Sequence, residues 1–165
     1  MNIYPDLYLD SILELSVETL NKNNIKGLMI DIDNTVVDTE KNIIDGLEDW
    51  YKKIKDAGIK CIILSNSSKI AKIRSVSDKL EIPYISLALK PLKSGFKRGI
   101  KLLDMDKENI AVVGDQIFTD VIGANRCKLF SILVKPINEQ DLWYTKWKRP
   151  IENKILEKYK KSNEK

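Results

Sequence analysis

Five short apolar runs recur along the chain, separated by segments of mixed polarity that are long enough to be helices. The runs predict strands at residues 25–32, 59–64, 82–86, 110–113 and 129–134. Runs that are apolar without alternation are typical of a parallel sheet covered on both faces. The intervening helices are expected at residues 42–57, 69–80, 94–103 and 119–126. This alternation predicts a doubly wound α/β fold with five parallel strands.

Apolar residues also repeat at helical spacing on either side of this core. The stripe that predicts an N-terminal helix within residues 1–24 consists of Leu9, Ile12, Leu13, Ser16, Val17 and Leu20. The stripe that predicts a C-terminal helix consists of Ile151, Ile155, Leu156 and Tyr159. Because no repeat or linker divides the chain, we expect one domain over 1–165, with a catalytic core at 25–135 and a basic extension at 136–165.

The composition, with 43% hydrophobic and 32% charged residues, is typical of a soluble globular protein. Apolar runs fall well short of the roughly 20 residues that span a bilayer, and the acidic N-terminal segment does not resemble a signal peptide. Cys61 and Cys127 lie in apolar contexts far apart in sequence and are expected to be reduced thiols. We therefore expect a cytoplasmic protein.

The net charge of +4 is concentrated at the C-terminal end, where residues 146–165 hold eight Lys and Arg against three Asp and Glu. Such a tail suits contact with an anionic membrane or an acidic partner, although a solvated helix face is the favoured interpretation of it. Trp143, Tyr144 and Trp147 cluster near the start of this tail and suit either core packing or an interfacial patch. Specific nucleic-acid binding is not expected, and homo-oligomerisation stays open.

The chain contains no histidine. This excludes Ser-His-Asp and Cys-His hydrolases, histidine phosphatases and histidine-ligated zinc sites. Acid/base chemistry is left to Asp, Glu, Lys, Tyr or Cys. With many carboxylates and two thiols, the composition favours a hard cation bound by oxygen.

Polar motifs follow four of the predicted strands, at the edge where open parallel sheets bind ligands. Along the chain they are Asp31-Ile32-Asp33-Asn34-Thr35, Ser65-Asn66, Lys90-Pro91 and Gly114-Asp115 with Asp120. Their shared edge is a stronger signal than any one of them. A lone D-x-D would usually be a solvated turn, and Asn34 and Gln116 could equally serve local turn hydrogen bonds.

Phosphoryl transfer accounts for this set of groups. Asp31 can bind a metal and attack phosphorus, while Asp33 protonates the leaving oxygen and later deprotonates water. Asp115 would complete a Mg²⁺ site, with Asp120 nearby, acting through water or capping the next helix. Ser65 and the amides around Asn66 can donate to phosphate oxygens, and Lys90 can neutralise charge.

These four motifs, in this order, resemble those of the haloacid dehalogenase superfamily. The resemblance implies a phosphatase in which Asp31 is the nucleophile, Asp33 the acid/base, Ser65 and Lys90 the phosphate-binding groups, and Asp31, Asp33, Asp115 and Asp120 the magnesium site. Lys93 is a weaker alternative to Lys90, because Lys90 has the adjoining Pro91. Asp at the second position fits phosphatases rather than dehalogenases.

A narrower resemblance, to the YqeG family, rests on YPDLYLDSI, IKGLMIDIDNT, ALKPLKSGF, GDQIFTDVIGAN and WKRPIE. Relatives of that family include organellar phosphatidylglycerophosphate phosphatases, so the resemblance implies a lipid substrate at the inner face of a membrane. A soluble phosphomonoester is the alternative. The segments after the first and second motifs leave room for a short flap but not for a cap domain, and an open site favours a large or surface-bound substrate.

Two other classes of protein share parts of this pattern. A signalling receiver domain has a similar architecture, but its phosphoacceptor Asp follows the third strand, where this chain has Ser86 and Leu87. A binding module without activity would not need the complete set of acids. Both are disfavoured relative to an enzyme.

Overall fold

A parallel sheet of six strands lies at the centre of the computed structural model, which describes residues 2–138 and 148–163. The strand order is β1-β6-β5-β2-β3-β4, and every neighbouring pair is parallel. The strands are β1 (Leu7–Leu9), β2 (Gly27–Ile30), β3 (Lys60–Leu64), β4 (Tyr84–Ile85), β5 (Ile110–Gly114) and β6 (Phe130–Val134). The doubly wound α/β class is confirmed, with one strand more than expected.

The extra strand replaces the start of the predicted N-terminal helix. Leu7, Tyr8 and Leu9 pair with Ile132, Leu133 and Val134 of β6. A 3-10 turn, η1 (Ile12–Glu14), and a short helix, α1 (Val17–Lys22), follow it. Ser11 and Ser16 accept hydrogen bonds from the first turns of these two elements, so each Ser begins a new segment and one continuous helix cannot form. The prediction of a single helix there was wrong.

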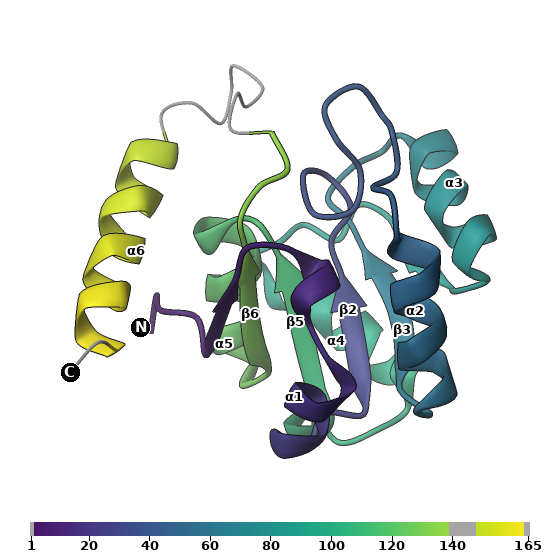
Figure 1. The fold of residues 1–165 in the computed structure, drawn as a ribbon, viewed down its shortest axis with the longest axis horizontal. Helices are drawn as coiled ribbons and strands as arrows, with labels where there is room; N and C mark the ends of the chain where they lie inside the picture. The colour runs from purple at the N-terminus through teal and green to yellow at the C-terminus, as the bar shows by residue number, and fades with distance from the viewer. Residues whose placement is uncertain (1, 139–147, 164–165) are drawn as a thin grey trace.

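The helices cover both faces of the sheet (Figure 1). In the view of Figure 1, α2 (Leu47–Asp56) lies in front of the sheet, and α4 (Lys93–Leu103) and α5 (Ile122–Cys127) lie behind it. Alternate strand residues explain the two layers: Leu28 and Ile30 pack in the cluster with α1, α2 and α3 (Ile70–Leu80), whereas Met29 packs with α4.

Two helices differ from their predicted bounds. α2 begins at Leu47 rather than at residue 42, because residues 35–46 form a flap in which Val37 and Ile43 make an antiparallel bridge. The segment after β5 begins as a π-helical turn, η3 (Ile117–Val121), before α5 continues it. Neither this flap nor the segment from residue 68 to residue 89 contains a cap domain, as expected.

A C-terminal helix, α6 (Arg149–Asn163), packs beyond β6 beside the N-terminal segment (Figure 1). Ile155 and Leu156 contact the cluster that includes Leu133, and the ring of Tyr159 stacks on that of Tyr4 at 6.3 Å. Ile151, expected on the buried side, is exposed instead. Trp143, Tyr144 and Trp147 lie outside the described residues.

Candidate active site

Four carboxylate side chains and two cationic side chains, those of Lys90 and Arg149, meet at the carboxyl edge of the sheet, where β2 and β5 end. Asp31 follows β2, and Asp115 and Asp120 follow β5. One oxygen of each of these three side chains lies within 4.8 Å of one from each of the others, and all three residues are buried. The fourth carboxylate, that of Glu152, comes from α6 and is also buried.

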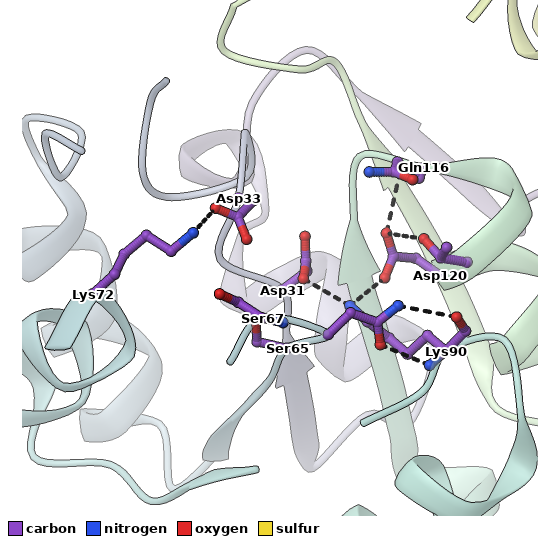
Figure 2. Close-up of polar contacts among 10 residues, drawn as sticks. Asp31, Asp33, Ser65, Ser67, Lys72, Lys90, Gln116 and Asp120 are labelled. Atoms are coloured by element: carbon purple, nitrogen blue, oxygen red, sulfur yellow. Dashed lines mark hydrogen bonds and ion pairs between the residues drawn. The ribbon is translucent and has the colours of Figure 1, made fainter. Parts of the chain in front are cut away.

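Lys90 joins two of these carboxylates (Figure 2). Its ammonium donates to Asp31 Oδ1 and to Asp120 Oδ1, each at 2.7 Å, and its side chain is almost wholly buried. Burial would lower the pKa of Lys90, but the negative charges of Asp120 and Asp31 outweigh it and raise that pKa above its usual range. Lys90 therefore stays charged, and the expected choice of Lys90 over Lys93 agrees with this geometry, since Lys93 is exposed at the start of α4.

Asp31 and Asp33 lie in different environments, as their two expected roles require. Burial, opposed by Lys90 and reinforced by Asp120, raises the pKa of Asp31 to about 7. The Asp33 side chain is 44% exposed and forms an ion pair with Lys72 from α3 (Figure 2). The Asp33 side chain does not belong to the group of three carboxylates that could hold a cation.

Asp115 has one oxygen engaged and one open. Arg149 Nη2 donates to its Oδ2 at 2.6 Å, whereas its buried Oδ1 has no hydrogen-bond partner among the described residues. Burial and the neighbouring Asp31 raise the pKa of Asp115 well above its usual value, and Arg149 partly offsets this. An unpartnered buried carboxylate oxygen is unfavourable unless a cation or donor reaches it.

The charge balance and the donor set fit a divalent cation. When Asp31, Asp115, Asp120 and Glu152 are ionised, the ion pairs with Lys90 and Arg149 leave two negative charges uncompensated among the described residues. Hard oxygen ligands of this kind suit Mg²⁺ better than they suit soft metals. Within residues 2–138 and 148–163, the side chains that could hold such an ion are those of Asp31, Asp115 and Asp120.

The loops around this cluster are held by hydrogen bonds, some local and one set between segments far apart in the chain. The side chain of Ser65, which is fully buried, accepts a hydrogen bond from the Ser67 amide at 3.1 Å. The amide of Gln116 donates to Asp120 Oδ2 at 3.2 Å (Figure 2). Asn34, with a φ of 59°, accepts from the amides of Ile137 and Asn138 and so connects the loop after β2 to the chain beyond β6.

Three participants escaped sequence reasoning: Lys72, Arg149 and Glu152. Lys72 lies on an ordinary helix and carries no local signal. Arg149 and Glu152 stand three apart within the WKRPIE segment of the YqeG resemblance, a spacing that places them on one helix face, but no local pattern indicates that this face contacts Asp115. Cys61 and Cys127 are both free thiols, as expected.

Comparisons with known proteins agree with the geometry. The profile of the haloacid dehalogenase-like hydrolases matches residues 35–128, which include Ser65, Lys90, Asp115 and Asp120. The chain is 35% identical to the probable phosphatase YqeG of Bacillus subtilis over 158 residues, which are 95% of this chain and 91% of that protein.

Solved structures share the fold. An uncharacterised protein from Listeria monocytogenes superposes with a TM-score of 0.58 at 20% identity, over 72% of this chain and 85% of its own. A haloacid dehalogenase-like hydrolase from Brucella suis superposes with a TM-score of 0.55 at 12% identity, over 72% and 88%. From the profile match and the YqeG relative together, we conclude that this chain belongs to the haloacid dehalogenase-like hydrolase family and is a phosphatase related to YqeG.

Proposed function

We propose that the protein is a Mg²⁺-dependent phosphomonoesterase that works through an aspartyl-phosphate on Asp31. The observation that carries the proposal is the position of the Lys90 ammonium, 2.7 Å from both Asp31 and Asp120, which with Asp115 form the group of carboxylates that could hold a cation. A nucleophilic carboxylate, a fixed cation and an oxygen-lined metal position are the parts that transfer of a phosphoryl group requires.

The reaction divides into two displacements at phosphorus. An Asp31 oxygen forms a bond to phosphorus while the ester P–O bond breaks, and Asp33 gives its proton to the departing oxygen. Asp33 then removes a proton from water, which attacks phosphorus and releases inorganic phosphate and free Asp31. Ser65 and the amides near Asn66 would bind the phosphate oxygens, and bound Mg²⁺ would supply charge stabilisation.

Asp31→Asn tests this mechanism. The variant keeps the size of the side chain and removes the nucleophile, so we expect Mg²⁺-dependent phosphate release to fall to background while the far-UV circular dichroism and the melting transition persist. Asp45→Asn, on the exposed flap, is the matched control. Phosphate release at the wild-type rate from Asp31→Asn would rule the mechanism out.

For the substrate, we propose a phosphorylated lipid headgroup of the phosphatidylglycerophosphate type, met at the inner face of a membrane. Three leucines support this choice: Leu87, Leu89 and Leu92 are 53%, 57% and 52% exposed and lie on the loop that carries Lys90. Leu87 and Leu89 have left-handed backbones, with φ of 46° and 57°, which are unfavourable for leucine and are often retained for function.

Cations flank these leucines, a combination that suits an anionic lipid surface. Arg98 donates to the carbonyl of Leu87 at 3.2 Å, Arg126 donates to that of Pro91 at 3.4 Å, and Lys93 begins α4 next to Leu92. Among the described residues, no helix is both long and apolar enough to cross a membrane. Contact through this loop would therefore be peripheral.

Release of phosphate from phosphatidylglycerophosphate in mixed micelles, compared with sugar and nucleotide phosphates, separates the lipid from the soluble substrate. A variant with Leu87→Asn, Leu89→Asn and Leu92→Gln is expected to lose binding to anionic vesicles and lipid turnover but to keep turnover of p-nitrophenyl phosphate. Asn is chosen at 87 and 89 because it tolerates a positive φ. Higher activity on a soluble metabolite, with no vesicle binding at low salt, would favour the alternative.

A further inference from the structure

The pair Arg149–Glu152 forms a polar clamp between α6 and the segment that carries Asp115 and Asp120. Arg149 donates to the Asp115 side chain at 2.6 Å and, through Nη1, to the Asp115 carbonyl at 2.9 Å and to Glu152 Oε2 at 3.3 Å. Glu152 Oε1 accepts from the amide of Phe118 at 3.1 Å. The clamp therefore bonds to the segment at two points, Asp115 and the amide of Phe118.

We propose that Arg149 and Glu152 are positioning residues that orient Asp115 toward the cation site. This inference rests on the cation site of the proposed function. Arg149 donates to Oδ2 of Asp115, and in the part of the chain that the structure describes the buried Oδ1 has no hydrogen-bond partner. A carboxylate held by one oxygen presents the other in a fixed direction, which is how outer partners orient metal ligands.

The contacts of α6 also stabilise the position of Asp120, through the π-helical turn η3. This turn contains both Phe118 and Asp120, and the Phe118 amide donates a hydrogen bond to Glu152. The turn also brings Asp120 Oδ2 to within 3.2 Å of the Gln116 amide. One side chain of α6 thus fixes Asp115, and another stabilises the turn that presents Asp120 to Lys90.

α6 is anchored well enough to deliver these side chains. Ile155 and Leu156 pack against the sheet, and the Lys160 ammonium lies 4.6 Å from the centre of the Tyr8 ring. Arg149 and Glu152 also line a cavity of about 390 Å³ between α6 and β6. A substitution at Arg149 therefore meets open space on one side, so a loss of function would not require collapse of the core.

Calorimetric titration of the full chain with Mg²⁺, without substrate, tests the proposal. We expect Arg149→Gln to weaken Mg²⁺ affinity by about 10- to 100-fold, the range for loss of an outer partner of a metal ligand. Arg149→Lys should recover part of the loss, and Glu152→Gln should show a smaller one. Lys158→Gln removes the same charge from the exposed part of α6 and should leave the affinity unchanged.

Wild-type affinity in a folded Arg149→Gln variant would overturn the proposal. So would tighter binding, because it would mean that Arg149 competes with the cation. If Arg149→Gln does not fold, wild-type Mg²⁺ affinity in both Arg149→Lys and Glu152→Gln would likewise overturn the proposal. Mg²⁺ binding without turnover of any phosphate ester would count against the proposed function instead, and would leave the clamp standing.

Discussion

The side chain of Asn66 holds the backbone of Lys90 by two hydrogen bonds. Its Nδ2 donates to the Lys90 carbonyl at 3.0 Å, and its Oδ1 accepts from the Lys90 amide at 2.7 Å. Asn66 follows β3, and Lys90 lies on the loop after β4, so this contact connects the ends of two neighbouring strands. The Asn66 side chain therefore holds both the amide and the carbonyl of Lys90. This contact fixes the loop whose ammonium group lies between Asp31 and Asp120.

Asn66→Ala should release the Lys90 loop. Loss of two hydrogen bonds is expected to lower the free energy of unfolding by about 1–3 kcal/mol, and a shift of the ammonium by about 1 Å is enough to lower kcat on the order of 100-fold. Urea unfolding and steady-state kinetics check both effects. Ser68→Ala, at an exposed neighbour, serves as the control. A wild-type kcat for Asn66→Ala would show that Lys90 is positioned by other contacts.

Gly114 leaves room for the Asp120 side chain. A Cβ built on Gly114 would overlap Cγ and Oδ2 of Asp120. Gly114→Ala should therefore displace Asp120 from Lys90, remove most activity and destabilise the fold by about 1–3 kcal/mol, as overpacking does. At Gly58, where φ is 75° and an added Cβ meets no atom within 4 Å, an Ala should cost about 1 kcal/mol through backbone strain alone. Equal activity in the two variants would contradict this account.

The proposed acid role of Asp33 predicts a dependence on the leaving group. Asp33→Asn should slow hydrolysis of alkyl phosphates by about 10²- to 10⁴-fold, because their leaving oxygen needs a proton. In kcat/KM, which covers the first displacement but not the later attack of water that Asp33 also assists, the loss should be much smaller with p-nitrophenyl phosphate, whose leaving group departs as an anion. Lys72→Gln removes the ion-pair partner of Asp33 but keeps its carboxylate, and it should not show this selectivity. Equal losses of kcat/KM on both substrates in Asp33→Asn would exclude Asp33 as the acid.

The buried thiol of Cys61 makes the free energy of unfolding depend on pH in the alkaline range. Burial raises the pKa of its thiol to about 12, whereas an unfolded thiol titrates near ~8.5. Between these values the folded state binds more protons than the unfolded state, so the free energy of unfolding falls as pH rises, by up to about 1.4 kcal/mol per pH unit. Urea unfolding of the wild type and of Cys61→Val from pH 8 to pH 10.5 should show a steeper fall in the wild type. Parallel curves would mean that the thiol ionises without unfolding.

Much of the fold followed from local pattern. The five apolar runs became β2 to β6, because a strand buried on both faces must be apolar throughout. β1 escaped prediction because its three residues, Leu7–Leu9, are held by backbone pairing with β6 rather than by a pattern of their own. The π-helical start of the segment after β5 likewise has no sequence signature that separates it from an α-helix.

At the site, strand-end positions alone were enough to bring Asp31, Ser65, Lys90 and Asp115 to one edge, because parallel strands place their carboxyl ends together. Folding in three dimensions decided what the carboxylates touch. Lys90 lies between Asp31 and Asp120, and Arg149, 34 residues beyond Asp115, occupies one oxygen of that side chain. Contacts between residues so far apart in sequence depend on where α6 packs. That position is set by the sum of many apolar contacts, so no local pattern at the contacting residues predicts it.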